Sequence, residues 1–91
     1  MSGEASAGQT ETGVRAVVEV LAKALADRPD DVRVTESQHK QVTLIELFVS
    51  PQDIAKVIGR QGRTAAALRT LASTAGEREG KQVTLEIRES R

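Results

Sequence analysis

The sequence predicts an α+β domain in which three helices cover one face of a three-stranded mixed sheet. Apolar residues recur at helical spacing in two stretches, and they alternate with polar residues in three others. The resulting order is helix, strand, strand, helix, helix, strand. A short turn joins the first two strands, which should therefore be antiparallel. The helical stretch before the last strand is long enough for a crossover that makes it parallel.

Length and composition restrict the class of protein. With 91 residues the chain has room for one small core. We expect residues 1–12 to be a disordered tail and residues 13–91 to be the domain. The absence of cysteine excludes disulfides and thiolate metal sites, and no apolar run approaches the roughly 20 residues of a membrane span. We therefore expect a cytoplasmic protein without cofactor, metal or membrane partner.

The first helix and the hairpin follow from simple patterns. The helix should run from residue 14 to about Asp27, because Pro29 follows. A short strand is expected at 31–37 and a turn at 37–41, which would contain His39, a histidine without a companion for catalysis or metal binding. The buried stripe of the helix should consist of Val14, Val17, Val18, Leu21 and Leu25.

Residues 42–49 form the most apolar predicted strand. Ile45, Leu47 and Val49 should point toward the helices. The opposite face carries Val42, Leu44, Glu46 and Phe48, and is unusually apolar for a solvent-facing surface. This stripe is either a protein contact or a surface that the tail or a loop covers.

The stretch Ser50-Pro51-Gln52-Asp53 predicts a helix start, with Ser50 as the cap and Asp53 as a capping-box acid. A short helix should end at Gly59, and a second should run from Gly62 to Ala75 with Gly76 as its cap. The last strand is expected at 82–88, with Val83, Leu85 and Ile87 inward. The buried stripe of the second helix should be Ala65, Leu68, Leu71, Ala72 and Ala75.

The turn Gly59-Arg60-Gln61-Gly62 is the candidate functional feature. Thirteen basic and thirteen acidic residues give a net charge of zero, yet no acid occurs from Ile54 to Gly76. A turn that opens a helix presents free N–H groups and the positive end of the helix dipole, which suits a phosphate. The basic residues of this acid-free stretch are Lys56, Arg60, Arg63 and Arg69.

A short helix, a G-x-x-G turn and a second helix between strands resemble a KH domain, and the element order resembles the type II arrangement (αββααβ). The run Val57-Ile58-Gly59-Arg60-Gln61-Gly62-Arg63 resembles the small bacterial single-KH RNA-binding proteins of the KhpA type. Ser50-Pro51 ahead of it and Ala66, Leu68 and Arg69 behind it contribute to the resemblance. The resemblance covers roughly residues 14 to 89.

The resemblance implies that the loop clamps the backbone of about four single-stranded nucleotides. Gly59 and Gly62 would pack against that backbone, and Arg60 and Gln61 would contact phosphate. Lys56 and Arg63 would flank the site. Arg69 would lie further along, although a solvated charge is an equal reading. The bases would lie between Ile54, Val57 and Ile58 on one side and the last strand with residues 76–81 on the other, unless Ile54 or Ile58 belongs to the core.

The function that we expect is therefore non-enzymatic binding of single-stranded RNA in post-transcriptional regulation, with no small-molecule substrate. Binding should be weak, because no aromatic platform stands near the loop. The resemblance implies a homodimer or a Jag-type KH partner, with the strand stripe and Ala65-Ala66-Ala67 as candidate interfaces. A protein-assembly module and a binder of single-stranded DNA are the alternatives.

Overall fold

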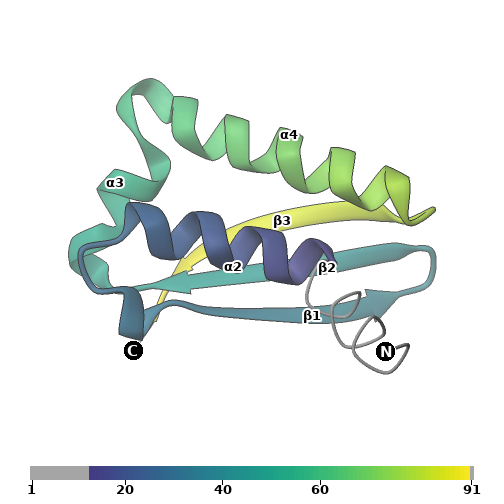
Figure 1. Ribbon diagram of the computed structural model, residues 1–91, viewed down its shortest axis with the longest axis horizontal. Helices are drawn as coiled ribbons and strands as arrows, with labels where there is room; N and C mark the ends of the chain where they lie inside the picture. The colour runs from purple at the N-terminus through teal and green to yellow at the C-terminus, as the bar shows by residue number, and fades with distance from the viewer. Residues whose placement is uncertain (1–12, 91) are drawn as a thin grey trace, which may run out of the picture.

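A computed structural model describes residues 13–90, and confirms the predicted fold class. The predicted tail at 1–12, and Arg91, lie outside the described residues. The strands β1 (Arg33–His39), β2 (Val42–Val49) and β3 (Gln82–Glu89) form one sheet in that order, with β1 antiparallel and β3 parallel to β2. The helices α2 (Val14–Leu25), α3 (Ile54–Ile58) and α4 (Arg63–Arg78) lie on one face of this sheet (Figure 1).

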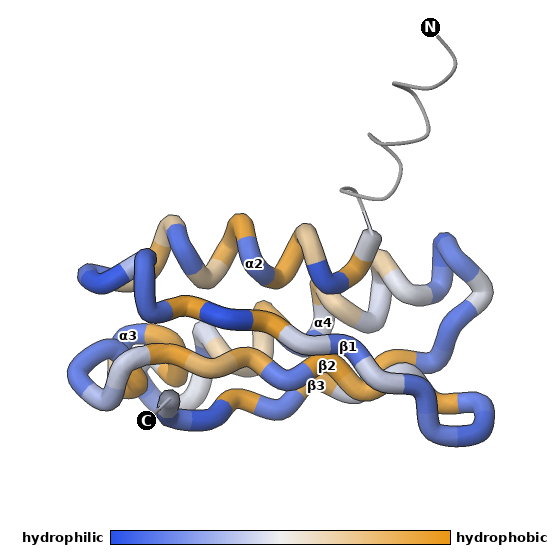
Figure 2. The backbone as a smooth tube through the Cα atoms, turned by 90° about the horizontal axis from the view of Figure 1, so that it is seen from below, coloured by the Kyte–Doolittle hydropathy of each residue, from blue (hydrophilic) through white to orange (hydrophobic). Residues whose placement is uncertain are grey.

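Strand β2 is central to the sheet and supplies the middle of the core. Ile45, Leu47 and Val49 are fully buried beneath the helices, as their spacing predicted. Figure 2 shows β2 as a mostly hydrophobic segment that begins at a hydrophilic hairpin. Thr43 is buried in the same row, and its hydroxyl donates to Gln38 Oε1 at 2.8 Å, which satisfies the one polar group there.

The other face of β2 is only partly exposed. Val42, Leu44 and Phe48 are half-buried, and the helices leave this side of the sheet open (Figure 1). Neighbouring side chains shield it in part, because the Arg33 guanidinium lies 5.2 Å from the Phe48 ring centroid. On the adjoining strand, Arg88 Nε donates to Glu46 Oε2 at 3.0 Å. The apolar stripe is thus interleaved with paired charges, and its role as a protein contact stays a prediction.

Two predictions about the first third of the domain were wrong. Helix α2 buries Val14, Val18 and Ala22, whereas Leu25, in its last position, is 39% exposed. Strand β1 continues to His39, so that this histidine ends the strand and is not part of the turn. The turn is reduced to residues 40 and 41, where Lys40 has φ 57°, because two-residue hairpin loops need positive φ.

Helix α4 is longer than predicted and buries a different side. It continues through Gly76 to Arg78, and Leu71 is 48% exposed instead of buried. Gly76 is not a cap but a close-packed helix residue, because a Cβ at this position would lie 2.4 Å from Val83 Cγ2 and 3.2 Å from the Lys81 carbonyl oxygen. The missing side chain thus lets α4 approach the start of β3.

We therefore expect Gly76→Ala to destabilise the domain, although alanine is the better helix former by about 1 kcal/mol. The overlap with Val83 should cost about 2 kcal/mol and outweigh that gain. Urea denaturation of Gly76→Ala, Val83→Ala and the double variant tests this. In the Val83→Ala background the glycine substitution should be much less harmful, and an equal loss in both backgrounds would contradict the packing argument.

Candidate nucleic-acid interface

The turn between α3 and α4 has a backbone that ordinary residues rarely adopt. Gly59 has φ 78° and ψ 172°, Gln61 has φ 57° and ψ 24°, and Gly62 has φ 75° and ψ 14°. Two hydrogen bonds close the turn, from Gly59 N to Ala55 O at 2.8 Å and from Gly62 N to Gly59 O at 3.1 Å. Three residues of the four have positive φ and reverse the chain between the helices, and two of them are glycine for this reason.

The two glycines meet different surroundings. A Cβ on Gly59 would lie 2.3 Å from Thr64 Oγ1 and 2.9 Å from the Thr64 backbone nitrogen. A Cβ on Gly62 would have no heavy atom within 4 Å apart from atoms of its own chain neighbours. Gly59 is thus required by packing inside the protein, whereas the space beside Gly62 is open to a ligand.

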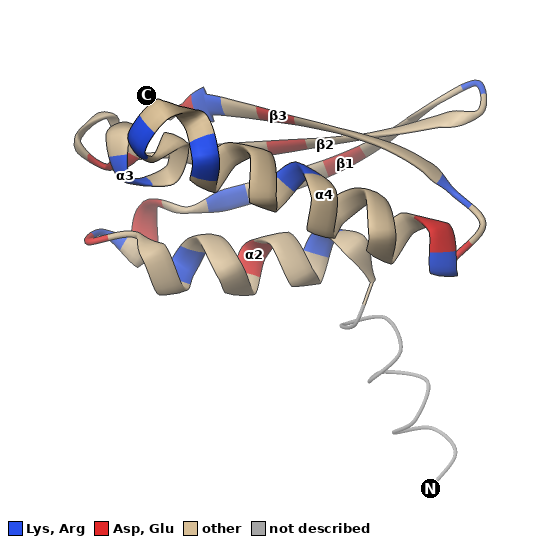
Figure 3. Cartoon of the chain, turned by 90° about the horizontal axis from the view of Figure 1, so that it is seen from above, with Lys and Arg blue, Asp and Glu red and all other residues tan. Residues whose placement is uncertain are grey.

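The loop presents basic and polar groups without competing acids. Arg60, Gln61 and Arg63 are exposed, and Arg63 Nη2 donates to Gln61 Oε1 at 3.2 Å. Gly62 caps α4 without a side-chain hydrogen bond. Within residues 13–90, no carboxylate lies within 4.0 Å of the arginines at 60, 63 or 69. Basic residues therefore mark α3 and the first turns of α4 (Figure 3).

Lys56 differs from these arginines, because its Nζ lies 3.2 Å from Asp27 Oδ2. Both side chains are at least half exposed, so the pair contributes little to stability and can open. Asp27 belongs to the segment after α2 and lies far from Lys56 in the sequence. The ion pair therefore could not be predicted from the acid-free stretch around Lys56.

Asp53 holds that segment against α3. The side chain is fully buried, and its two oxygens accept from Asp27 N at 3.1 Å and Arg28 N at 2.9 Å. The predicted capping box is therefore wrong, because Asp53 reaches a segment 25 residues away instead of its own helix start. The Ser50 cap is confirmed: its hydroxyl accepts from Gln52 N at 3.2 Å.

The three apolar candidates of α3 divide between core and surface. Val57 is fully buried in the core and exposes no surface that a base could contact. Ile54 is half-buried and packs against the core. Ile58 is half-buried and lies outside that core cluster, next to Gly59. Ile58 therefore has the best-placed apolar surface beside the loop.

Strand β3 and the segment before it border the same side of α4. Arg69 Nε donates to the Leu85 carbonyl oxygen at 3.4 Å, so the arginine lies along the outer edge of the sheet. Just before the start of β3, Lys81 Nζ lies 3.3 Å from a Glu36 oxygen and 3.4 Å from a Glu79 oxygen. The pKa of Lys81 is raised, chiefly by the hydrogen bond to Glu36. Lys81 is thus already paired, whereas Arg69 keeps its charge available.

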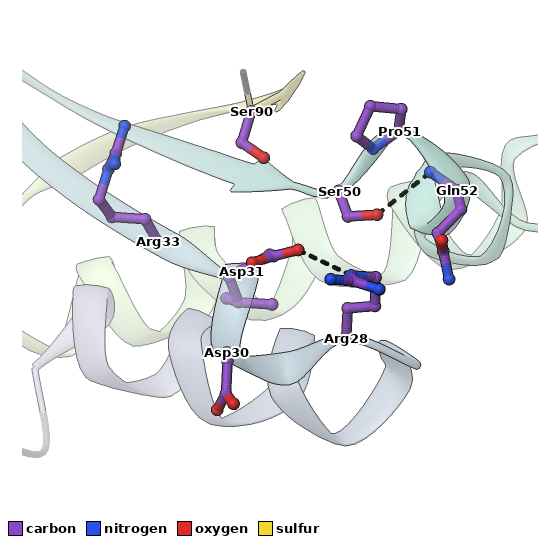
Figure 4. A pocket seen from close by; sticks show the side chains of 9 residues that line it. Arg28, Asp30, Asp31, Arg33, Ser50, Pro51, Gln52 and Ser90 are labelled. Carbon is purple, nitrogen blue, oxygen red and sulfur yellow. Dashed lines mark hydrogen bonds and ion pairs between the residues drawn. The ribbon is translucent and has the colours of Figure 1, made fainter.

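A hollow of about 690 Å³ opens elsewhere, between the segment after α2, the start of β1 and Ser50-Pro51-Gln52 (Figure 4). None of the predicted site residues lines it. Arg28 faces into it but is held by Asp31 at 2.9 Å, and this hydrogen bond raises the pKa of Arg28. Sequence reasoning did not identify this hollow, because its lining comes from short turns without a motif.

In the part of the chain that the structure describes, no helix has the length and apolar character of a membrane span. Among the same residues, no group of three histidine or acidic side chains could hold a metal ion.

Comparison with known proteins places this geometry in a family. A family model described as "KhpA/KhpB, KH domain" matches residues 15–87. The RNA-binding protein KhpA of Aquifex aeolicus is 47% identical over 78 residues, which cover 86% of this chain and 99% of that protein. Its namesake from Clostridium perfringens is 46% identical over 74 residues, or 81% and 99% of the two chains.

Solved structures show the same fold. Era of Aquifex aeolicus, bound to GDP and aluminium fluoride, superimposes with a TM-score of 0.61 at 19% identity. The match covers 85% of this chain and 30% of Era, so the likeness concerns one part of that larger protein. Era in complex with nucleotides 1506–1542 of 16S ribosomal RNA gives a TM-score of 0.58, also at 19% identity, and covers 84% and 29%. The chain belongs to the KhpA/KhpB family of KH-domain proteins, a non-enzymatic family, as its sequence predicted.

Proposed function

We propose that this protein binds single-stranded RNA by gripping the sugar–phosphate backbone with the loop Gly59-Arg60-Gln61-Gly62. The observation that supports this most directly is the combination of open backbone at Gly62 with exposed Arg60 and Arg63 that have no acidic partner in residues 13–90. The start of α4, where no side chain accepts a hydrogen bond from the backbone, adds N–H groups toward the same place. The relatives' name, RNA-binding protein KhpA, agrees with this assignment.

In this proposal Lys56 leaves its ion pair with Asp27 and binds a phosphate of the RNA instead. Arg69, which lies along the edge of β3, contacts the RNA further along its backbone. Ile58, and the exposed part of Ile54, offer apolar surface to the bases. Affinity should be low, because no aromatic side chain stands near the loop. We propose that a second copy or a Jag-type KH partner raises the affinity by multivalency, and that the protein acts in the cytoplasm in post-transcriptional regulation, as an RNA chaperone.

The loop proposal is tested by Arg60→Asp together with Gln61→Asp, which keeps both glycines. Affinity for a labelled single-stranded RNA of about ten nucleotides should fall at least tenfold, because two phosphate contacts become repulsive. Fluorescence anisotropy at several salt concentrations measures it. The wild-type slope of log affinity against log salt should be about −2 for three phosphates, at roughly −0.7 each.

The hairpin supplies a matched control. Lys40-Gln41 is also a basic residue followed by glutamine in a tight turn, but it lies at the opposite end of the sheet (Figure 1). Lys40→Asp with Gln41→Asp makes the same change in charge and should leave RNA affinity within about twofold of wild type, apart from long-range attraction. Equal losses in both variants would mean that overall charge matters and the loop does not. The same oligonucleotide as DNA shows whether RNA is preferred.

A protein-assembly role is the second candidate, and the apolar residues exposed on the helices favour it. It predicts that the loop variant keeps its oligomeric state, which sedimentation velocity measures. Assembly would be the main function if the folded wild-type protein bound neither RNA nor DNA.

A further inference from the structure

The segment that follows α2 places one acid against the basic site. No acid occurs from Ile54 to Gly76 in the sequence, but the fold brings Asp27 Oδ2 to 3.2 Å from Lys56 Nζ. The end of α2 and helix α3 lie at the same end of the molecule (Figure 1). Within residues 13–90, no other basic residue of the acid-free stretch has a carboxylate within 4.0 Å. The fold thus adds, at one position, a negative charge that the local sequence lacks.

A buried group fixes the position of Asp27. The backbone N–H groups of Asp27 and Arg28 donate to the two carboxylate oxygens of Asp53 at 3.1 and 2.9 Å. Asp53 is fully buried and immediately precedes α3, the helix that carries Lys56. This anchor therefore holds the acid and the lysine close to each other. The neighbouring cation is occupied elsewhere, because the Arg28 guanidinium lies 2.9 Å from Asp31 (Figure 4).

Lys56 can bind either the acid or a ligand. Its ammonium group is a point charge on a flexible four-carbon stem, and it stands in the helix that leads directly into the basic turn at Gly59. The side chains of Lys56 and Asp27 are 50% and 61% exposed, so their pair opens at little cost. A phosphate and a carboxylate on the same ammonium group would repel each other at short range. Binding of a phosphate therefore favours release of Asp27.

From these contacts we propose that Asp27 is a built-in competitor of RNA. In the free protein its carboxylate holds Lys56, and a phosphate of the RNA must displace it. When the RNA leaves, the carboxylate binds the lysine again. This role of Asp27 rests on the proposed grip by the loop, and it adds a residue that lowers the affinity and shortens the lifetime of the complex.

Asp27→Asn tests this role, because it removes the charge and keeps the shape and the backbone N–H that Asp53 accepts. Affinity of the full chain for the same single-stranded RNA should rise about threefold at low salt, which is the strength of an exposed ion pair. The gain should shrink as salt rises, since both side chains are exposed and screened. Stopped-flow kinetics should show most of the gain as slower dissociation, because the carboxylate competes within the bound complex.

Two further variants separate competition from a general change in charge. Asp30→Asn is the matched control: it removes the same charge from the same segment, but Asp30 is exposed and forms no ion pair within residues 13–90. It should change the affinity by less than about 1.3-fold, through long-range attraction alone. In a Lys56→Gln background, which itself should bind RNA more weakly, Asp27→Asn should add almost nothing, because the group that it frees is gone. Urea denaturation checks that all variants keep nearly native stability.

Three results would overturn the role of Asp27: unchanged affinity in Asp27→Asn, an equal gain in Asp30→Asn, or a gain that persists without Lys56. The loop variant separates this role from the proposed function. If Arg60→Asp with Gln61→Asp loses affinity while Asp27→Asn gains none, the loop proposal stands and the competitor does not. If the loop variant binds like wild type but Asp27→Asn still gains through Lys56, the competitor stands and the loop proposal does not. Absence of RNA binding in both wild type and Asp27→Asn would end both.

Discussion

Asp53→Ala should lower the free energy of unfolding by about 3 kcal/mol, a large part of the stability of a domain of this size. The carboxylate is fully buried, and it accepts from the backbone N–H groups of Asp27 and Arg28 at 3.1 and 2.9 Å. Alanine would leave both donors without their acceptor and a cavity beside α3. Urea denaturation followed by circular dichroism measures the loss.

Asp53→Asn separates charge from shape at the same position. The amide oxygen can accept one of the two hydrogen bonds, while its NH₂ group would face the other donor, so the loss should be smaller but still more than 1 kcal/mol. Asp30→Ala is the matched control, because Asp30 is an exposed carboxylate in the neighbouring turn and should change stability by less than about 0.5 kcal/mol. If Asp53→Ala were as mild as Asp30→Ala, the buried carboxylate would not hold the segment after α2.

The role of Asp53 also shows which parts of the structure local sequence patterns can predict. The alternation of residues 42–49 set which side of β2 is buried, and Ser50 acts as a cap in the way its position predicted. Asp53 stands where a capping-box acid belongs, yet its partners are 25 and 26 residues away, and no local pattern records them. The Lys56–Asp27 pair was missed for the same reason, since it joins two segments that only the folded chain brings together.

Local sequence patterns also failed to predict which helix residues are buried. The five residues of α3 are too few for a clear period, so Val57 could not be told apart from Ile58, although one is buried and the other borders the loop. In α4, Gly76 suggested the end of the helix. In the structure, its missing side chain leaves room for Val83 of β3. Leu71 was placed in the core because it stands three residues after Leu68 in the predicted buried stripe, yet it is 48% exposed.

The basic glycine turn was predictable because its requirements are local. Neighbouring residues alone determine the positive φ at Gly59 and Gly62, the helix end at Ile58 and the helix start at Arg63. The sequence could not show that the two glycines are required for different reasons. In the folded turn Thr64 lies against Gly59 but not against Gly62. That difference leads to the second large effect that we expect.

Gly59→Ala should destabilise the domain by about 3 kcal/mol and abolish RNA binding by displacing the loop. At φ 78° and ψ 172° the backbone is in a region that essentially only glycine occupies. The added Cβ would also overlap Thr64, at 2.3 Å from Oγ1 and 2.9 Å from the backbone nitrogen. Shortening Thr64 to alanine can relieve the first contact but not the second, so Gly59→Ala with Thr64→Ala should recover only part of the stability.

Gly62→Ala is the informative partner of this variant. Its φ of 75° and ψ of 14° lie in the left-handed region that other residues tolerate at a cost of about 1 kcal/mol, and no heavy atom apart from those of its own chain neighbours stands within 4 Å of the new Cβ. The variant should therefore fold with nearly native stability. If RNA passes beside Gly62, the methyl group should still reduce affinity severalfold, which anisotropy measures at a temperature where the protein is fully folded. Unchanged affinity in folded Gly62→Ala would show that the nucleic-acid backbone does not approach this glycine, and that Gly59 and Gly62 shape the turn without touching RNA.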